Sequence, residues 1–204
     1  MNDKLVQLLS NLFHPLLSMP WAAVVFVLFT PLCVLPTSLK FQLVGEVLLF
    51  SFLLPALSIV ALSSIGIVKN GVALRDRKDR VIPLFLQFVF CILQAIVLQW
   101  QGLQTWVVAC FWGGCLLTFT FFIVTFWWKI SGHAAGNAAL AFVSLLLYFW
   151  FPHIMPLYIP ILAILLTGAI GSIRIYLQRH TLAQVAVGSL TGVLCMALAY
   201  WVLL

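Results

Sequence analysis

Five long runs of the chain contain no Lys, Arg, Asp or Glu, and they predict its architecture. The runs cover residues 5–39, 47–68, 81–128, 130–173 and 180–204. A transmembrane helix needs about 20 residues, so the two longest runs, of 48 and 44 residues, each hold two helices. The sequence therefore predicts seven spans, at 19–37, 44–67, 82–100, 104–127, 135–151, 156–173 and 184–204.

The spans are predicted to be helices rather than strands. Their apolar runs are continuous and lack the alternation of a membrane barrel, and an open sheet in lipid would leave backbone groups unpaired. The predicted fold class is all-α, a polytopic transmembrane helical bundle of about six to seven spans. Because Pro20, Pro31 and Pro36 interrupt the first span, residues 1–18 are expected to form an amphipathic or interfacial lead-in to a single transmembrane domain over 19–204.

Composition excludes a water-soluble domain. Hydrophobic residues make up 65% of the chain and charged residues 7%, against about 25% charged in an ordinary soluble domain. Since each pair of spans returns the chain to the same side, most cations fall in loops on one membrane face. These cations are Lys69, Arg75, Arg77, Lys78, Arg80, Lys129, Arg174 and Arg179. This asymmetry follows either from the positive-inside rule or from the binding of an anion.

The sequence Ser131-Gly132-His133 stands directly ahead of the predicted span 135–151. The first turn of a helix has free backbone N–H groups and the positive end of the helix dipole, and therefore suits a phosphate. Gly132 allows the backbone to come close to such a ligand. The alternative is that Ser131 only caps the helix and that His133 only lies in the wet interface.

The last cationic loop contains a second candidate set, Arg174, His180 and Gln184. His180 and Gln184 are four residues apart, so on a helix they share one face and lie within reach of each other. Arg174 and His180 would point well apart on one continuous helix. We therefore expect the chain to bend between them, with a bound oxyanion as the reason.

These two sets resemble the second and third motifs of the type-2 phosphatidic acid phosphatases, membrane lipid phosphate phosphatases that share a site with vanadium haloperoxidases. The family's second motif is Pro-Ser-Gly-His, in which Ile130 here replaces the proline. Its third is Ser-Arg-x5-His-x3-Asp, in which Ile173 replaces the serine and Gln184 the aspartate. The resemblance covers residues 69–192. It implies a phosphatase-like helical core that hydrolyses a lipid phosphomonoester or diphosphate without a metal or other cofactor.

The resemblance also implies a role for each site residue. His180 is the nucleophile that forms a phosphohistidine, and His133 protonates the departing lipid oxygen. Gln184 accepts a hydrogen bond from His180, as the family's aspartate does, but adds no charge. The phosphate-binding residues are expected to be Arg174, Ser131, Gly132, Arg77, Arg80 and Lys78. The implied substrates are phosphatidylglycerol phosphate, phosphatidate, polyprenyl diphosphate or lipid A phosphates, with no nucleic-acid partner.

The family's first motif, Lys-x6-Arg-Pro, is matched by residues 69–83 in chemistry but not in spacing. Arg77 and Arg80 are three residues apart on one helix face, and we expect these two to bind phosphate, with Lys78 in reserve. The alternative is a solvated charged turn at the membrane surface.

Several other residues are expected to lie outside the site. His153 falls on the opposite membrane face and His14 in the lead-in, so neither should join the two site histidines. The five cysteines form no CxxC pair and are assigned to packing. Gly188 and Gly192 are also assigned to packing between helices.

Two other functions remain open. An anionic-lipid transporter would also gather cations at the rim, but it would place ionisable groups near mid-membrane, where these spans have almost none. A non-catalytic lipid-binding relative would keep the arginines and lose a histidine. The expected location is a bacterial inner membrane. The cation count favours a cytoplasmic site, but substrate-binding arginines inflate that count, so we favour the periplasmic face.

Overall fold

The computed structural model describes residues 3–68 and 77–204, and every regular element in these ranges is helical. The α-helices are α1 (Asp3–Leu12), α2 (Ser18–Phe29), α3 (Thr37–Leu48), α4 (Leu54–Ser64), α5 (Val81–Trp100), α6 (Thr105–Val124), α7 (Gly132–Trp150), α8 (Tyr158–Tyr176) and α9 (Leu182–Leu203). Shorter turns are the 3-10 segments η1 (Pro15–Leu17), η2 (Pro31–Val34) and η4 (Lys78–Arg80) and the π turn η3 (Leu49–Leu53). The predicted all-α fold is confirmed for these residues.

Six helical stretches in the described ranges are long and apolar enough to cross a membrane. A seventh crossing is present if the bent pair α1–α2 counts as one span. The last five predicted spans agree with α5 to α9, with each end displaced by no more than three residues. The architecture is therefore that of a multi-pass membrane protein.

The predicted first span, 19–37, is wrong. Helix α2 ends at Phe29, because Thr30 adopts an extended conformation and its hydroxyl caps a new turn that begins at Pro31. With 12 residues, α2 is too short to cross alone. It reaches a sufficient length only together with η1 and α1, which it meets at a bend of 42°.

The N-terminal helix α1 is amphipathic and lies against the bundle. Val6 is buried and packs with Ile170 and Ile173 of α8. The segment expected as a lead-in therefore contributes directly to the packing around α8. As a result, the chain that follows α1 is held beside α7.

The second crossing begins at Thr37, seven residues earlier than predicted. The prediction began the span only after Lys40, yet Lys40 lies within α3, as does Glu46. The Lys40 ammonium donates to the carbonyl of Cys33, and the Glu46 carboxylate accepts a hydrogen bond from Gln101. These partners thus satisfy both charges without ending the helix.

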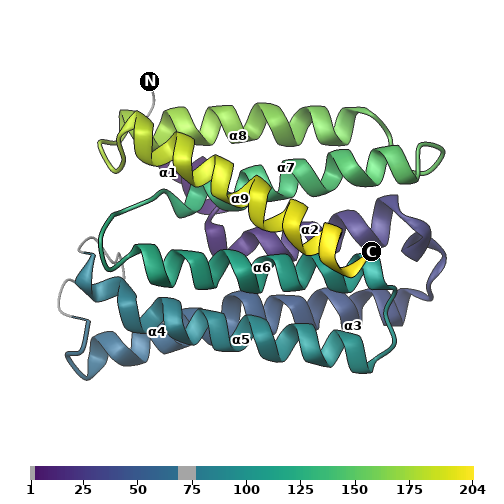
Figure 1. Ribbon diagram of the computed structural model, residues 1–204, viewed down its shortest axis with the longest axis horizontal. Helices are drawn as coiled ribbons and strands as arrows, with labels where there is room; N and C mark the ends of the chain where they lie inside the picture. Colours follow the sequence, from purple (N-terminus) through teal and green to yellow (C-terminus); the bar gives the residue numbers. More distant parts are fainter. Residues whose placement is uncertain (1–2, 69–76) are drawn as a thin grey trace.

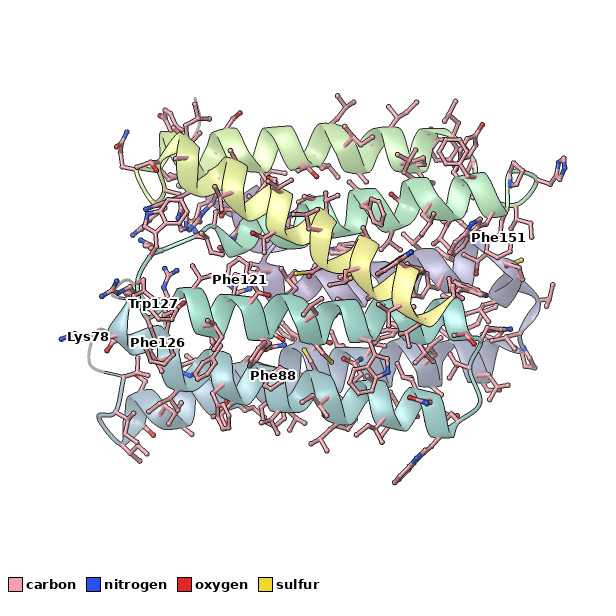
Figure 2. All side chains as sticks on the ribbon, in the orientation of Figure 1. Lys78, Phe88, Phe121, Phe126, Trp127 and Phe151 are labelled. Atoms are coloured by element: carbon pink, nitrogen blue, oxygen red, sulfur yellow. The ribbon has the colours of Figure 1, made fainter. Side chains whose placement is uncertain are left out.

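The helix ends gather at two faces of the bundle (Figure 1). One end holds the start of α1 and the connections α4–α5, α6–α7 and α8–α9, and the other holds the connections α5–α6 and α7–α8 and the C-terminus. Figure 2 shows Lys78 and Trp127 at the first end and Phe151 at the second. The described cations at the first end are Lys4, Arg77, Lys78, Arg80, Lys129, Arg174 and Arg179. We call this face the cationic end.

Helix α7 lies at the centre and packs against α2, α8 and α9. Small residues permit the close contact with α9: a Cβ at Gly188 would lie 2.6 Å from the carbonyl oxygen of Ser131, and one at Gly192 would collide with the carbonyl of Ala135. The assignment of both glycines to packing is confirmed. At the cationic end, the Ser131 N–H donates to the carbonyl of Gln184 at 3.1 Å, so the contact joins the two loops that carry the predicted motifs.

Candidate functional site

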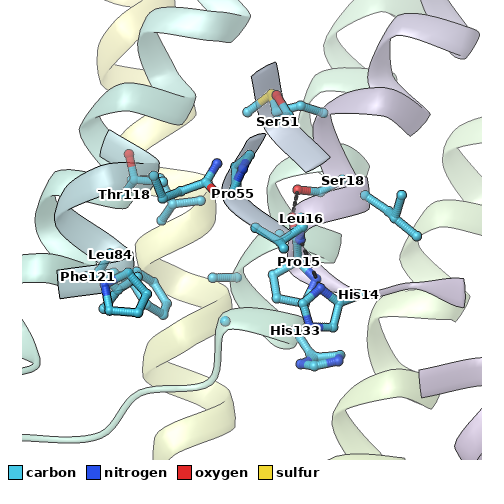
Figure 3. Close-up of a pocket in the computed structure, with 18 of the residues that line it drawn as sticks. His14, Pro15, Leu16, Ser18, Ser51, Pro55, Leu84, Thr118, Phe121 and His133 are labelled. Carbon is cyan, nitrogen blue, oxygen red and sulfur yellow. Dashed lines mark hydrogen bonds between the residues drawn. The ribbon is translucent and has the colours of Figure 1, made fainter. Parts of the chain in front are cut away.

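A cavity of about 630 Å³ lies at the cationic end and extends between α4, α5, α6 and α7. The arginines and histidines on its wall are Arg80, Arg174, His14, His133 and His180. The deeper wall is mostly apolar. Figure 3 shows the rings of His14 and His133 at one end of the cavity and Ser51 and Thr118 farther along it. The volume falls within the range of small-molecule sites, about 300–1,000 Å³.

His180 reaches the cavity from the loop between α8 and α9. The chain leaves α8 through Gln178, whose φ of 53° lies in the left-handed region, and the N–H of His180 returns to the carbonyl of Arg174 at 3.3 Å. The predicted bend is therefore present, and it brings Arg174 and His180 to one cavity. Thr181 then begins α9 with a capping box, in which its hydroxyl and the side chain of Gln184 each accept a backbone N–H.

The expected contact between His180 and Gln184 is also present. The Nδ1 of His180 and the Oε1 of Gln184 are 3.1 Å apart. Oε1 accepts the N–H of Thr181 as well, at 3.3 Å, which fixes the orientation of the amide. Because an amide oxygen only accepts, Nδ1 carries the proton and Nε2 keeps its lone pair. His180 therefore has one nitrogen held by Gln184 and one available for chemistry.

His133 lies in the first turn of α7, where it is buried and lines the cavity. Its Nε2 is 3.1 Å from the carbonyl oxygen of Ser10 in α1, so Nε2–H donates and Nδ1 keeps a lone pair. Ser131 is the N-cap of α7, and its hydroxyl accepts the N–H of Ala134 at 3.4 Å. Ser131 is fully buried and is not part of the cavity wall, whereas Gly132 is.

His14 belongs to this cluster, so the prediction that it lies apart is wrong. It occupies the bend between α1 and η1, and its ring meets that of His133 edge to face with centroids 5.1 Å apart. Leu16 N–H donates to its Nδ1 at 3.3 Å, so Nε2 carries the proton. The pair His14-Pro15 is a local signal for a helix start, but nothing in the sequence places this turn beside α7. His153 lies in the exposed connection at the opposite end, as predicted.

Arg174 brings an incompletely paired guanidinium to the cavity. Its Nη1 donates to the hydroxyl of Ser10 at 3.0 Å. Its Nε is buried and has no hydrogen-bond partner among the described residues. A buried donor without a partner costs about 1–3 kcal/mol, and a bound oxyanion would satisfy it.

The cations of the first predicted motif separate into two groups. Arg80 lies on the cavity wall. Arg77 is exposed and donates to the carbonyl of Trp127, and Lys78 is exposed at the outer edge of the cationic end in Figure 2. The structure therefore does not bring Arg77 and Lys78 to the cavity. The preceding part of the motif, residues 69–76, lies outside the described ranges.

The surroundings of His180 favour its neutral form. Burial is the main reason that its pKa is lowered to about 4 from an ordinary value of 6.5. The hydrogen bond to Gln184 raises the pKa, and the charges of Lys129, Arg174 and Arg80 lower it. The imidazole is therefore predominantly neutral at neutral pH. Lys129 contributes to this field, although it belongs to neither of the two predicted motifs.

Replacing Gln184 with Glu is expected to raise the pKa of His180, because a carboxylate at this position stabilises the imidazolium. Wild-type His180 gains its second proton only as the pH falls through about 4, so in the variant protonation should begin at a higher pH. NMR of histidine-labelled protein measures both titrations. Gln178→Glu, which adds the same charge at an exposed position of the same loop, is the control. A His180 midpoint that moves no further in Gln184→Glu than in this control contradicts the contact.

Comparisons of the chain with protein-family models, curated proteins and solved structures find no match.

In the part of the chain that the structure describes, no group of three or more His, Cys, Asp or Glu side chains is placed to hold a metal ion. All five cysteines are free and four are buried, in agreement with a packing role. The fold and the site together define a multi-pass helical membrane protein with a cavity that is cationic at one end and apolar within the bundle.

Proposed function

We propose that this protein is a lipid phosphate phosphatase, similar to the type-2 phosphatidic acid phosphatases. The observation that carries the proposal is the meeting of Arg174, His133 and His180 on one cavity, although they come from two separate loops. Removal of a phosphoryl group requires a cation, a proton donor and a nucleophile. These three side chains provide one of each, in the motifs that resemble the family.

The proposed reaction has two steps. In the first, Nε2 of His180 attacks phosphorus and forms a P–N bond as the P–O bond to the lipid breaks, while Gln184 holds Nδ1–H. The free Nδ1 of His133 takes the proton of the substrate's monoanionic phosphate and passes it to the departing oxygen, while its Nε2–H remains on the carbonyl of Ser10. In the second step, water attacks phosphorus as the P–N bond to His180 breaks, and the proton that water loses passes through Nδ1 of His133 to the departing phosphate.

The phosphoryl oxygens are proposed to bind to donors at the cationic end of the cavity. Arg174 offers its unpartnered Nε, and Arg80 lies on the same cavity wall. Gly132 places the first backbone N–H groups of α7 there, at the positive end of the helix dipole. His14 adds an N–H from Nε2. These donors stabilise the negative charge of the transition state.

The lipid part of the substrate is proposed to occupy the deeper part of the cavity. This part lies between membrane-spanning helices and has mostly apolar walls. A hydrocarbon chain there stays out of water while its phosphate remains among the cations. The candidate substrates are phosphatidylglycerol phosphate, phosphatidate, polyprenyl diphosphate and lipid A phosphates.

Release of inorganic phosphate tests this function. Purified protein in detergent micelles is given each of the four candidate substrates, and we expect release from at least one. An anionic-lipid transporter would instead move a labelled lipid phosphate between the leaflets of a vesicle without hydrolysis. No release from any of the four substrates, together with such movement, would contradict the phosphatase.

We further propose that the protein lies in a bacterial inner membrane with the cationic end at the periplasmic face. Arg80 and Arg174 line the cavity, so their positions reflect anion binding as well as topology. The C-terminus lies at the opposite end of the bundle (Figure 1). A reporter fused after Leu204 therefore faces the cytoplasm in this orientation.

A further inference from the structure

Gln87 lies on the cavity wall two helical turns along α5 from Arg80, and its amide oxygen has no partner among the described residues. Helix α5 lines the cavity with a stripe of four residues, Pro83, Leu84, Gln87 and Cys91. Gln87 is only 9% exposed, and its Oε1 has no hydrogen-bond partner among the described residues. Seven residues of helix place Gln87 about 10 Å beyond Arg80 along the axis. A buried oxygen of this kind calls for a donor in the cavity.

Other uncharged polar groups lie on the same wall. The Nε2 of Gln87 donates to the sulfur of Cys91 at 3.4 Å. Thr118 donates its hydroxyl to backbone carbonyls of its own helix, and Ser51 donates to Oε1 of Gln94 at 2.6 Å. One donor of Gln87 and the hydroxyl donors of Thr118 and Ser51 are thus engaged, whereas the oxygens of all three side chains can still accept. We call Ser51, Gln87, Cys91 and Thr118 the buried polar cluster.

The backbone is also irregular beside this cluster. Pro55 has no N–H to donate to the carbonyl of Ser51, and the helix forms the π turn Leu49–Leu53 directly ahead of it. Ser51 and Pro55 both line the cavity. Such π turns occur frequently at functional sites, because they redirect side chains within an otherwise regular helix.

We propose that the buried polar cluster binds a hydroxyl group carried on the hydrocarbon part of the lipid substrate, about 10 Å along α5 from Arg80. This inference rests on the proposed function for the phosphate end of the cavity. The cluster has no charged member, so it suits a neutral group. The surrounding wall is mostly apolar, so the rest of the ligand's chain near this neutral group must be apolar. A hydroxyl donates to Oε1 of Gln87 and provides the partner that this oxygen lacks.

The test compares dodecyl phosphate with a dodecyl phosphate that carries one hydroxyl near the middle of its chain. In the wild-type protein we expect KM to be about threefold to tenfold lower for the hydroxylated compound, the usual effect of one hydrogen bond. Gln87→Leu should remove this preference, so that the two compounds have the same KM. Gln99→Leu, the same change at an exposed position of α5 outside the cavity wall, should keep the preference.

The corresponding pair of dodecyl phosphonates, which cannot be hydrolysed, separates this inference from the proposed function. Their dissociation constants are measured by calorimetry with wild-type protein and with Gln87→Leu. Equal binding of the two phosphonates by the wild-type protein, or a preference that survives Gln87→Leu, overturns the inference. If neither phosphate ester is hydrolysed but the phosphonate preference depends on Gln87, the inference stands and the phosphatase fails.

Discussion

Replacing His180 with Ala is expected to abolish phosphate release, with kcat/KM lower by about 10⁴-fold or more. The proposed reaction passes through a bond between phosphorus and Nε2 of this side chain, and Gln184 orients that nitrogen through the contact at Nδ1. The remaining cations still bind the substrate, so the loss should appear in kcat more than in KM. The assay is release of inorganic phosphate by purified protein in micelles.

His153→Ala is the matched control for this variant. His153 is an exposed histidine at the opposite end of the bundle, and its removal should leave the rate unchanged. Thermal unfolding in detergent checks that both variants are folded. Phosphate release by a folded His180→Ala protein at more than about a tenth of the wild-type rate contradicts the nucleophilic role.

Replacing Arg174 with Ala is expected to lower kcat/KM by about 10²- to 10³-fold, the usual effect of losing a donor to transition-state charge. Arg174 has a buried Nε without a partner in the described structure, and it lies on the cavity wall with His180. Lys at this position should restore only part of the loss, because an ammonium group is a point charge and does not reproduce the guanidinium fork.

Arg179→Ala is the control for the loss of a positive charge. Arg179 is exposed in the same loop and is not on the cavity wall, so its removal should change kcat/KM by less than about threefold at moderate salt. The rates are measured with one lipid phosphate at a fixed ionic strength. An equal loss in the two variants would mean that the loop acts only through its overall charge.

The sequence was sufficient to predict most of the bundle, because a charge inside a lipid-facing helix is costly and long uncharged runs therefore mark spans. The same rule placed the start of the second crossing too late. Lys40 lies in the first turn of this helix and Glu46 farther along it, and hydrogen bonds with Cys33 and Gln101 satisfy them. The rule also missed the end of α2 at Phe29, because charges do not mark it: Pro31, one of the prolines that interrupt the predicted span, begins a new turn there.

In the site, contacts between residues close in sequence were predictable and distant ones were not. The spacing of His180 and Gln184 fixes their contact through helix geometry. The contact of Ser10 with His133 joins residues 123 positions apart, and no hydrophobic periodicity or motif in the sequence predicts it. His14 was placed outside the site for the same reason. Gln87 lies in an apolar run of the sequence, and its role could be inferred only from its position on the cavity wall.

The most direct test is to capture the covalent intermediate. Protein mixed with a lipid phosphate is quenched in alkali during turnover, because phosphohistidine survives there, and is then digested for mass spectrometry. A phosphoryl group on His180, absent from a sample treated with acid, is the expected result. Continued phosphate release with no phosphoryl group on His180, or with the group on another residue, would contradict a site in which His180 attacks phosphorus.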